Sequence, residues 1–237
     1  MYLDGLIQVA GIRSLEEAHM LRACGVDLLG FPLRLDFHQP DTSEAEARHI
    51  IEAVGAESSV LITYEEDPAR LIDLCRFLNV RTVQIHSEAS PDILALIKAG
   101  TKVRQTSGPR LSSGIQIIKS YVIGREILSP RQFVQEYSST CDAFITDTFD
   151  PRTGASGATG KVHDWKVSAE LVQHSLRPII LAGGLTPANV RQAIVAVSPA
   201  AVDVHTGVER ADGSKDPELV RTFVREALAG FAEAMNG

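Results

Sequence analysis

Two glycine-containing segments of the chain have the composition of a phosphate-binding loop. In the first, an apolar run leads into Gly183 and Gly184 and then into a Thr-Pro pair that favours the start of a helix. The second contains His205, Thr206 and Gly207 after another apolar run. Because glycine has no Cβ, its backbone N–H can approach an anion closely, and a following helix adds a partial positive charge. A tight turn would explain either segment alone, but the two together predict a phosphate site.

A carboxylate and two histidines are candidates for proton transfer. Asp147 ends the apolar stretch Ala143–Asp147, His86 ends the stretch Thr82–His86, and His38 lies between apolar runs. A carboxyl group can act as a general acid when burial raises its pKa, and histidine exchanges protons near neutral pH. Two simpler interpretations remain open. Asp147 could cap the next turn, and a single histidine is more often a hydrogen-bonded structural residue.

The segment that follows Asp147 is rich in glycine. Gly154, Gly157 and Gly160 predict a loop mobile enough to act as a lid over a substrate. The pair Gly160-Lys161 is not a nucleotide-binding P-loop, because the first glycine and the final Ser or Thr of that motif are missing. No His and carboxylate pair has the helical spacing of metal ligands, so we predict no metal.

Composition excludes several classes of protein. The chain has 237 residues, 44% of them apolar and 22% charged, which excludes intrinsic disorder. A formal charge of −7 with 5% aromatic residues argues against nucleic acid as a partner. No apolar run reaches the roughly 18 residues of a membrane span, and the three cysteines lack the spacing of a disulfide framework or a zinc site. We therefore expect a cytoplasmic protein with neither a nucleic-acid nor a membrane partner.

Short runs rich in Val, Ile and Leu alternate with amphipathic stretches of helical period, which is typical of repeated βα units around a parallel sheet. Eight units without a dividing linker predict a single-domain (β/α)8 barrel over residues 1–237. A doubly wound open sheet and a two-domain protein are the alternatives. The expected strands are Leu6–Ala10, Asp27–Phe31, Ser59–Thr63, Thr82–His86, Lys102–Gln105, Ala143–Asp147, Pro178–Ala182 and Ala200–Val204.

The expected helix starts carry capping signals. The pairs Ser14 with Glu17 and Ser43 with Glu46 have the spacing of capping boxes, in which each side chain accepts a hydrogen bond from a free backbone N–H. The segment Ser107–Gly124 fits the pattern poorly and could be an extra strand or helix. The eight helices are expected to begin near Ser14, Ser43, Asp67, Ser90, Ser129, Asp164, Thr186 and Asp216.

Taken together, these motifs resemble the phosphoribosylanthranilate isomerase family, the barrel enzymes of tryptophan biosynthesis. The similarity extends over nearly the whole chain and is strongest in its second half. It implies an Amadori rearrangement, in which an aminoaldose phosphate becomes an aminoketose phosphate without a cofactor. The segments that carry the resemblance are Val83–His86, Gly160–Trp165, Ile180–Val190 and Val202–Glu209 followed by Lys215-Asp216.

The resemblance also implies roles for individual residues. Asp147 matches the family's general acid, which protonates the ring oxygen of the sugar, and Asp203 is expected to bind the sugar. The family's base, a cysteine at the end of the first strand, is replaced by Ala10, which cannot carry a proton. No arginine stands where the family places the one that pairs with the anthranilate carboxylate, although Arg34 lies nearby.

Three outcomes are compatible with these two differences. In the first, another side chain acts as the base that Ala10 cannot provide, with His38 and His86 best placed, and the protein is the isomerase. Alternatively, the protein acts as an isomerase or lyase on a different phosphosugar, or it binds a sugar phosphate without turnover. We expect the isomerase reaction on a small phosphorylated sugar, carried out by a monomer or homodimer.

Overall fold

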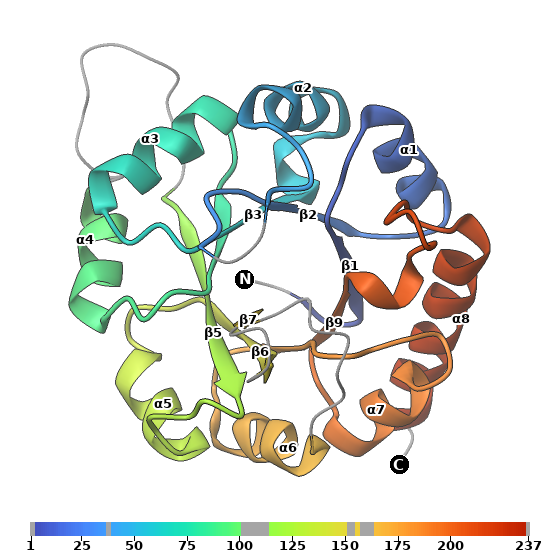
Figure 1. Ribbon diagram of the computed structural model, residues 1–237. Helices are drawn as coiled ribbons and strands as arrows, with labels where there is room; N and C mark the ends of the chain where they lie inside the picture. The colour runs from blue at the N-terminus through green and yellow to red at the C-terminus, as the bar shows by residue number, and fades with distance from the viewer. Residues whose placement is uncertain (1–2, 37–38, 101–113, 151–154, 157–163, 236–237) are drawn as a thin grey trace.

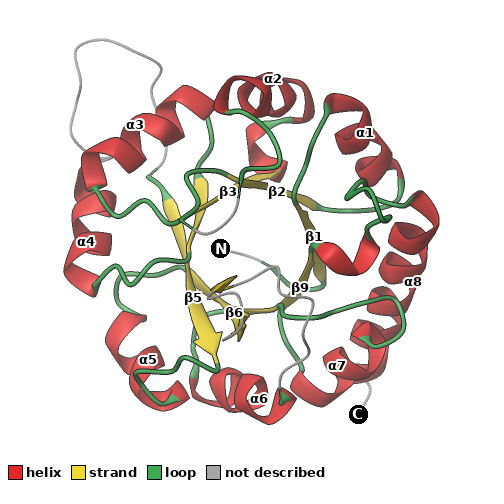
Figure 2. Ribbon diagram, in the orientation of Figure 1, coloured by secondary structure: helices red, strands yellow, loops and turns green. Residues whose placement is uncertain are grey.

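The computed structural model describes residues 3–36, 39–100, 114–150, 155–156 and 164–235. Eight parallel strands of this part close into a barrel, because β1 pairs with both β2 and β9. A ring of helices surrounds the barrel (Figures 1 and 2). The predicted (β/α)8 architecture is therefore confirmed.

The elements have the following bounds. The barrel strands are β1 (Leu6–Ala10), β2 (Leu28–Pro32), β3 (Ser59–Thr63), β4 (Thr82–Ile85), β5 (Gln116–Ile123), β6 (Ala143–Asp150), β8 (Ile179–Leu181) and β9 (Ala201–Val204). A short strand, β7 (Ala155–Ser156), pairs antiparallel with the end of β6. The helices are α1 (Leu15–Ala23), α2 (Glu44–Val54), α3 (Pro68–Leu78), α4 (Pro91–Gly100), α5 (Pro130–Tyr137), α6 (Trp165–His174), α7 (Val190–Val197) and α8 (Pro217–Ala234), with 3-10 turns η1 (Ala56–Ser58) and η2 (Thr206–Val208).

Successive side chains of each strand point alternately into and out of the barrel, which divides the core into two layers. Side chains such as Val83 and Ile85 face outward and join the large apolar cluster between strands and helices. Smaller clusters fill the inside of the barrel, for example Ile118 with Ile145 and Ile180. This interior is a packed core, so a ligand can enter only at the ends of the strands.

The prediction of the fifth strand was wrong. Residues Lys102–Gln105 lie outside the described residues, and the place between β4 and β6 is taken by β5, within the segment whose structure the sequence left open. Lys119 in the middle of β5 explains the error, because a charged residue interrupts an otherwise apolar run. Its side chain is nevertheless buried on the outer face of the strand.

Side-chain caps begin most of the helices as expected. The Ser14 hydroxyl accepts a hydrogen bond from the Glu17 backbone N–H. The Glu17 carboxylate accepts from the backbone N–H groups of Arg13 and Lys215 instead of closing a capping box. A reciprocal box forms at Ser129. The seventh helix begins at Val190, later than predicted, because the Asn189 side chain holds the preceding turn.

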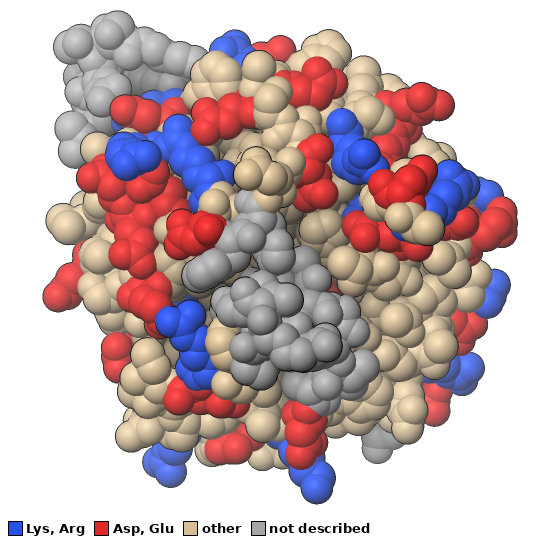
Figure 3. Space-filling view, viewed as in Figure 1, with Lys and Arg blue, Asp and Glu red and all other residues tan. Residues whose placement is uncertain are grey.

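Charged side chains of both signs are intermixed around the face of the barrel seen in Figure 3. Among the described helices, none is both long and apolar enough to cross a membrane.

Candidate active site

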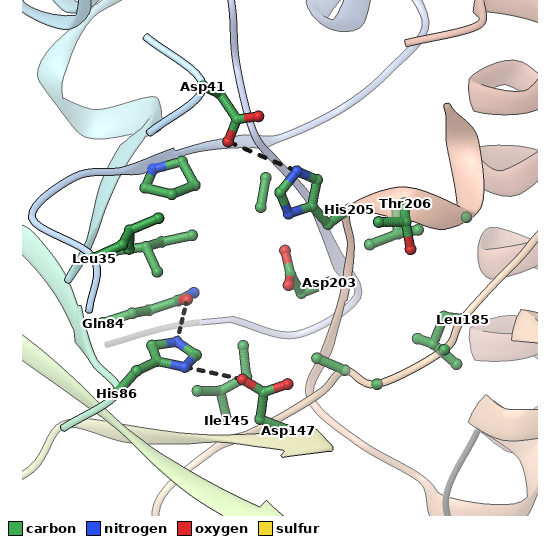
Figure 4. A pocket seen from close by; sticks show the side chains of 18 of the residues that line it. Leu35, Asp41, Gln84, His86, Ile145, Asp147, Leu185, Asp203, His205 and Thr206 are labelled. Carbon is green, nitrogen blue, oxygen red and sulfur yellow. Dashed lines mark hydrogen bonds and ion pairs between the residues drawn. The ribbon is translucent and has the colours of Figure 1, made fainter. Parts of the chain in front are cut away.

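A cavity of about 350 Å³ opens at the carboxyl ends of the strands. Its walls include residues in or just after β4, β6, β8 and β9, so segments far apart in the sequence meet there (Figure 4). This is the end of a (β/α)8 barrel at which active sites are built.

Asp147 and His86 form a pair inside the cavity. The His86 Nδ1 lies 3.0 Å from Asp147 Oδ2, and the two side chains are 9% and 7% exposed. The other Asp147 oxygen accepts a hydrogen bond of 2.8 Å from the backbone N–H of Thr148. On its far side, the His86 ring meets Gln84 Oε1 at 3.4 Å. With a partner at each ring nitrogen, His86 fixes the orientation of the Asp147 carboxyl group.

A second carboxyl group, Asp203, lines the same cavity from the end of β9. Its Oδ1 accepts a hydrogen bond of 2.9 Å from Gln8 Nε2 on the neighbouring strand β1. Burial raises the pKa of Asp203 to about 7, and the nearby Asp147 carboxylate adds to the rise against the opposing effect of Gln8. Asp203 therefore changes its charge in the neutral range.

The two glycine segments meet at one side of the cavity. Gly183 and Gly184 both have positive φ, +98° and +67°, so other residues would be strained there. A Cβ on Gly207 would overlap with the carbonyl oxygen of Leu185, which shows how closely the two loops approach each other. Among the described residues, the N–H groups of Gly183 and Gly184 have no hydrogen-bond acceptor. These donors are the groups that a phosphate oxygen requires.

A buried lysine supports the loop after β9. The Lys215 side chain is fully buried, and its Nζ donates to Glu209 Oε1 at 2.7 Å and to the carbonyl oxygen of His205 at 3.2 Å. The His205 ring lies 3.3 Å from Glu209 and 3.8 Å from Asp41. Lys215 therefore fixes the backbone that carries the predicted phosphate ligands, a role that its position in the sequence did not reveal.

The structure brings most of the predicted site residues into one cavity. Asp147, His86, Asp203, Gly183, Gly184, His205, Thr206 and Gly207 all line it. His38 and the proposed lid residues Gly154, Gly157 and Gly160 lie outside the described residues. Gln8 and Asn189 were not predicted. Asn189 accepts from the Thr186 N–H and donates to the Gly184 carbonyl, which ties the glycine turn to the start of α7.

The two positions that differ from the family pattern are also defined. Ala10 lies in the cavity wall at the end of β1. Arg34, which has a left-handed backbone at φ +52°, pairs with Glu44 at 2.9 Å and with Glu65 at 3.4 Å. It lines a neighbouring cavity instead, whereas Gln39 lines the site itself. Arg34 is therefore engaged elsewhere in this conformation.

In the described part of the chain, no group of three His, Cys, Asp or Glu side chains is arranged to hold a metal ion.

Known proteins share this architecture and much of the sequence. A family model described as "N-(5'phosphoribosyl)anthranilate (PRA) isomerase" matches residues 14–226. The chain belongs to the PRA isomerase family. Among its relatives in that family, N-(5'-phosphoribosyl)anthranilate isomerase 2 of Methanosarcina mazei is 33% identical, and the alignment covers 97% of both chains. The enzyme of Methanocella arvoryzae is 34% identical over 93% of this chain and 96% of the relative.

Solved PRA isomerase structures superpose on nearly the whole chain. The structure from Thermotoga maritima has a TM-score of 0.74 at 26% identity and covers 94% of this chain and 98% of its own. Another PRA isomerase, solved in complex with reduced 1-(o-carboxyphenylamino)-1-deoxyribulose 5-phosphate, has a TM-score of 0.72 at 25% identity, with 94% and 97% coverage. The family resemblance seen in the sequence is therefore confirmed.

Proposed function

We propose that this PRA isomerase family member converts N-(5'-phosphoribosyl)anthranilate into the corresponding 1-deoxyribulose 5-phosphate by an Amadori rearrangement. One observation carries the proposal. The carboxyl group of Asp147 is held by His86 in the cavity that also contains both glycine segments. An acid and an anion site in one cavity are what the first step of this reaction requires.

The phosphate group of the substrate would bind where the loops after β8 and β9 converge. The N–H groups of Gly183 and Gly184 are available as donors, and Gly207 lets the second loop approach without steric overlap. Neutral backbone donors attract the phosphate without adding a positively charged side chain beside the carboxyl groups of the other walls.

Asp147 would then donate its proton to the ring oxygen of the ribose. The bond between C1 and that oxygen breaks, and the nitrogen lone pair forms the double bond to C1. His86 acts as a positioning residue, because its Nδ1 holds Asp147 Oδ2 at 3.0 Å. No cofactor is needed, since the reaction only moves protons and bonding electrons within the substrate.

The test is a fluorescence assay with N-(5'-phosphoribosyl)anthranilate made in place from anthranilate. We expect turnover by the parent protein and a loss of 10²- to 10⁴-fold, the usual contribution of a general acid, in Asp147→Asn. Asp92→Asn makes the same chemical change on the exposed face of α4 and should leave the rate unaltered. Equal rates for the parent and Asp147→Asn would overturn the proposed role of Asp147.

A second candidate is isomerisation of a phosphosugar that lacks an aryl carboxylate. It is favoured by the engagement of Arg34 with Glu44 and Glu65, and by the amide of Gln39 in the cavity wall. Competition binding separates the two candidates. Tighter binding of an aminodeoxyribulose phosphate with an uncharged N-phenyl group than of its o-carboxyphenyl counterpart would favour this second reaction.

We further propose a cytoplasmic enzyme that is a monomer or homodimer. The Thermotoga maritima PRA isomerase is described as dimeric in a structure of monomers generated from it. Sedimentation equilibrium of this protein decides between the two states.

A further inference from the structure

The removal of the C2 proton needs a base, and the methyl group of Ala10 cannot supply one. We propose that Asp203 is the general base that accepts this proton, acting from β9 in place of a side chain at the end of β1. The proposal rests on the isomerase reaction proposed above and adds a second proton-transfer residue to it.

The register of the barrel places Asp203 of β9 close to Ala10, the position at the end of β1 that carries no proton acceptor. Gln8 of β1 pairs with Asp203 of β9, and their side chains are hydrogen-bonded at 2.9 Å on the inner face. Ala10 lies two residues further along that face. With strands about 4.8 Å apart and a rise of about 3.3 Å per residue, the two Cα atoms are roughly 8 Å apart. A substrate atom between them is within reach of the Asp203 carboxylate.

The carboxyl group of Asp203 has one oxygen available for the substrate. Its Oδ1 is occupied by Gln8, whereas Oδ2 has no hydrogen-bond partner among the described residues. Figure 4 shows this carboxyl group inside the cavity, between His205 on one side and Asp147 on the other. The hydrogen bond from Gln8 fixes its orientation and leaves the second oxygen free to accept a proton.

The charged groups around Asp203 favour a base that works near neutral pH. Burial raises its pKa to about 7 against the opposing effects of the Gln8 hydrogen bond, His86 and Lys215, and Asp147 adds to the rise once it has given up its proton. Asp41, further out in the cavity, also has a raised pKa because it is partly desolvated. A base is most effective when its pKa is close to the working pH, because it is then ionised and still binds a proton well.

The other described groups in the cavity are less suited to this step. Both ring nitrogens of His86 have partners, Asp147 and Gln84. His205 faces Glu209 and belongs to the loop that the phosphate would contact. Tyr64 stays protonated, because burial raises the pKa of its phenol far above neutral.

The step balances in protons and electrons. Asp203 takes the proton from C2, the C2–H electron pair forms the double bond between C1 and C2, and the C1–N π electrons return to nitrogen. The resulting enolamine gains a proton at C1 and loses the proton of its C2 hydroxyl, which gives the ketone. Asp147 has lost one proton and Asp203 has gained one, and exchange through solvent restores both for the next turnover.

The test measures kcat/KM against pH for the parent and for Asp203→Asn. In the parent, we expect the rate to rise with pH through a value near 7, and C2-deuterated substrate to react more slowly than the protiated form. Asp203→Asn should lower kcat by 10²- to 10⁴-fold and remove that rise. Binding of the reduced 1-deoxyribulose 5-phosphate analogue and the far-UV circular dichroism spectrum show whether the variant is folded.

Two further variants separate proton transfer from structural damage. Gln8→Leu removes the hydrogen bond that lowers the Asp203 pKa, so the rising limb should move to higher pH. Ala10→Cys added to Asp203→Asn should recover activity, because it restores a proton acceptor on the neighbouring strand. Asp92→Asn is the matched control, since it makes the same chemical change on the exposed face of α4, away from the cavity, and should retain the limb and the isotope effect.

Retention of the rising limb in Asp203→Asn, or an unmoved limb in Gln8→Leu, would overturn the assignment of the base. Absence of turnover by the parent protein would instead overturn the proposed reaction. The two failures are therefore distinguishable in the same set of measurements.

Discussion

The buried pair of Lys215 and Glu209 should dominate the stability of the loop after β9. Replacing Lys215 with Met keeps the length of the side chain but removes the ammonium group that bonds to Glu209 Oε1 at 2.7 Å and to the His205 carbonyl. Leaving one member of a buried pair uncompensated costs about 3–5 kcal/mol. Because Glu209 keeps 17% of its side chain exposed, we expect the lower end, about 3 kcal/mol.

The measurement is urea unfolding at pH 7, followed by circular dichroism, for the parent and for Lys215→Met. Arg225→Met serves as the control, since Arg225 pairs with Glu226 at the surface and its loss should cost under about 0.5 kcal/mol. The double variant Lys215→Met with Glu209→Gln should be more stable than Lys215→Met alone, because the stranded charge is gone. A loss below about 1 kcal/mol in Lys215→Met would refute this reasoning.

Three other outcomes are expected. Gly207→Ala should weaken binding of the reduced substrate analogue at least tenfold in calorimetry, because the new methyl group overlaps with a carbonyl oxygen of the neighbouring loop; unchanged affinity would contradict the close approach of the loops. Thiol labelling of the native protein at pH 8 should modify Cys24 before Cys75 and Cys141, whose thiol pKa values burial raises to about 12 and 11, as peptide mass spectrometry can verify. Burial lowers the pKa of Lys119 from 10.5 to about 8, so as pH rises the folded state loses this proton before the unfolded state does. Lys119 therefore contributes stability at high pH, and this contribution is lost as pH falls from 10.5 towards 8. The free energy of unfolding of the parent relative to that of Lys119→Met should therefore rise by about 3 kcal/mol as pH increases from 8 to 10.5. A difference that does not change with pH would contradict the lowered pKa of Lys119.

The barrel was predictable because its repeating unit leaves a strong pattern in the sequence. Short apolar runs such as Ser59–Thr63 have both faces covered, and helix starts such as Ser43 and Asp67 have residues that accept hydrogen bonds from free backbone N–H groups. The fifth strand was not predictable in the same way. Burial of Lys119 depends on the carbonyl oxygens of Ser87 and Ser120, which accept its hydrogen bonds, and such a contact across the fold leaves no local signal.

The candidate site was predictable where residue type and strand-end position coincide. Asp147, His86 and the glycine segments were identified from these two features, and the structure places them in one cavity. The contacts that set their properties join distant parts of the chain. Gln8 reaches Asp203 across 195 residues, and the engagement of Arg34 with Glu65 depends on how two loops fold together. No spacing rule within the sequence indicates either contact.

The fate of the C2 carbon of the ribosyl group tests the central claim most directly. N-(5'-phosphoribosyl)anthranilate labelled with carbon-13 at that atom can be followed by NMR with the parent protein and with Asp147→Asn. The proposed isomerisation predicts that the label changes from an alcohol carbon to a ketone carbon with the parent and remains an alcohol carbon with the variant. A label that stays an alcohol carbon with the parent protein would contradict the proposed reaction.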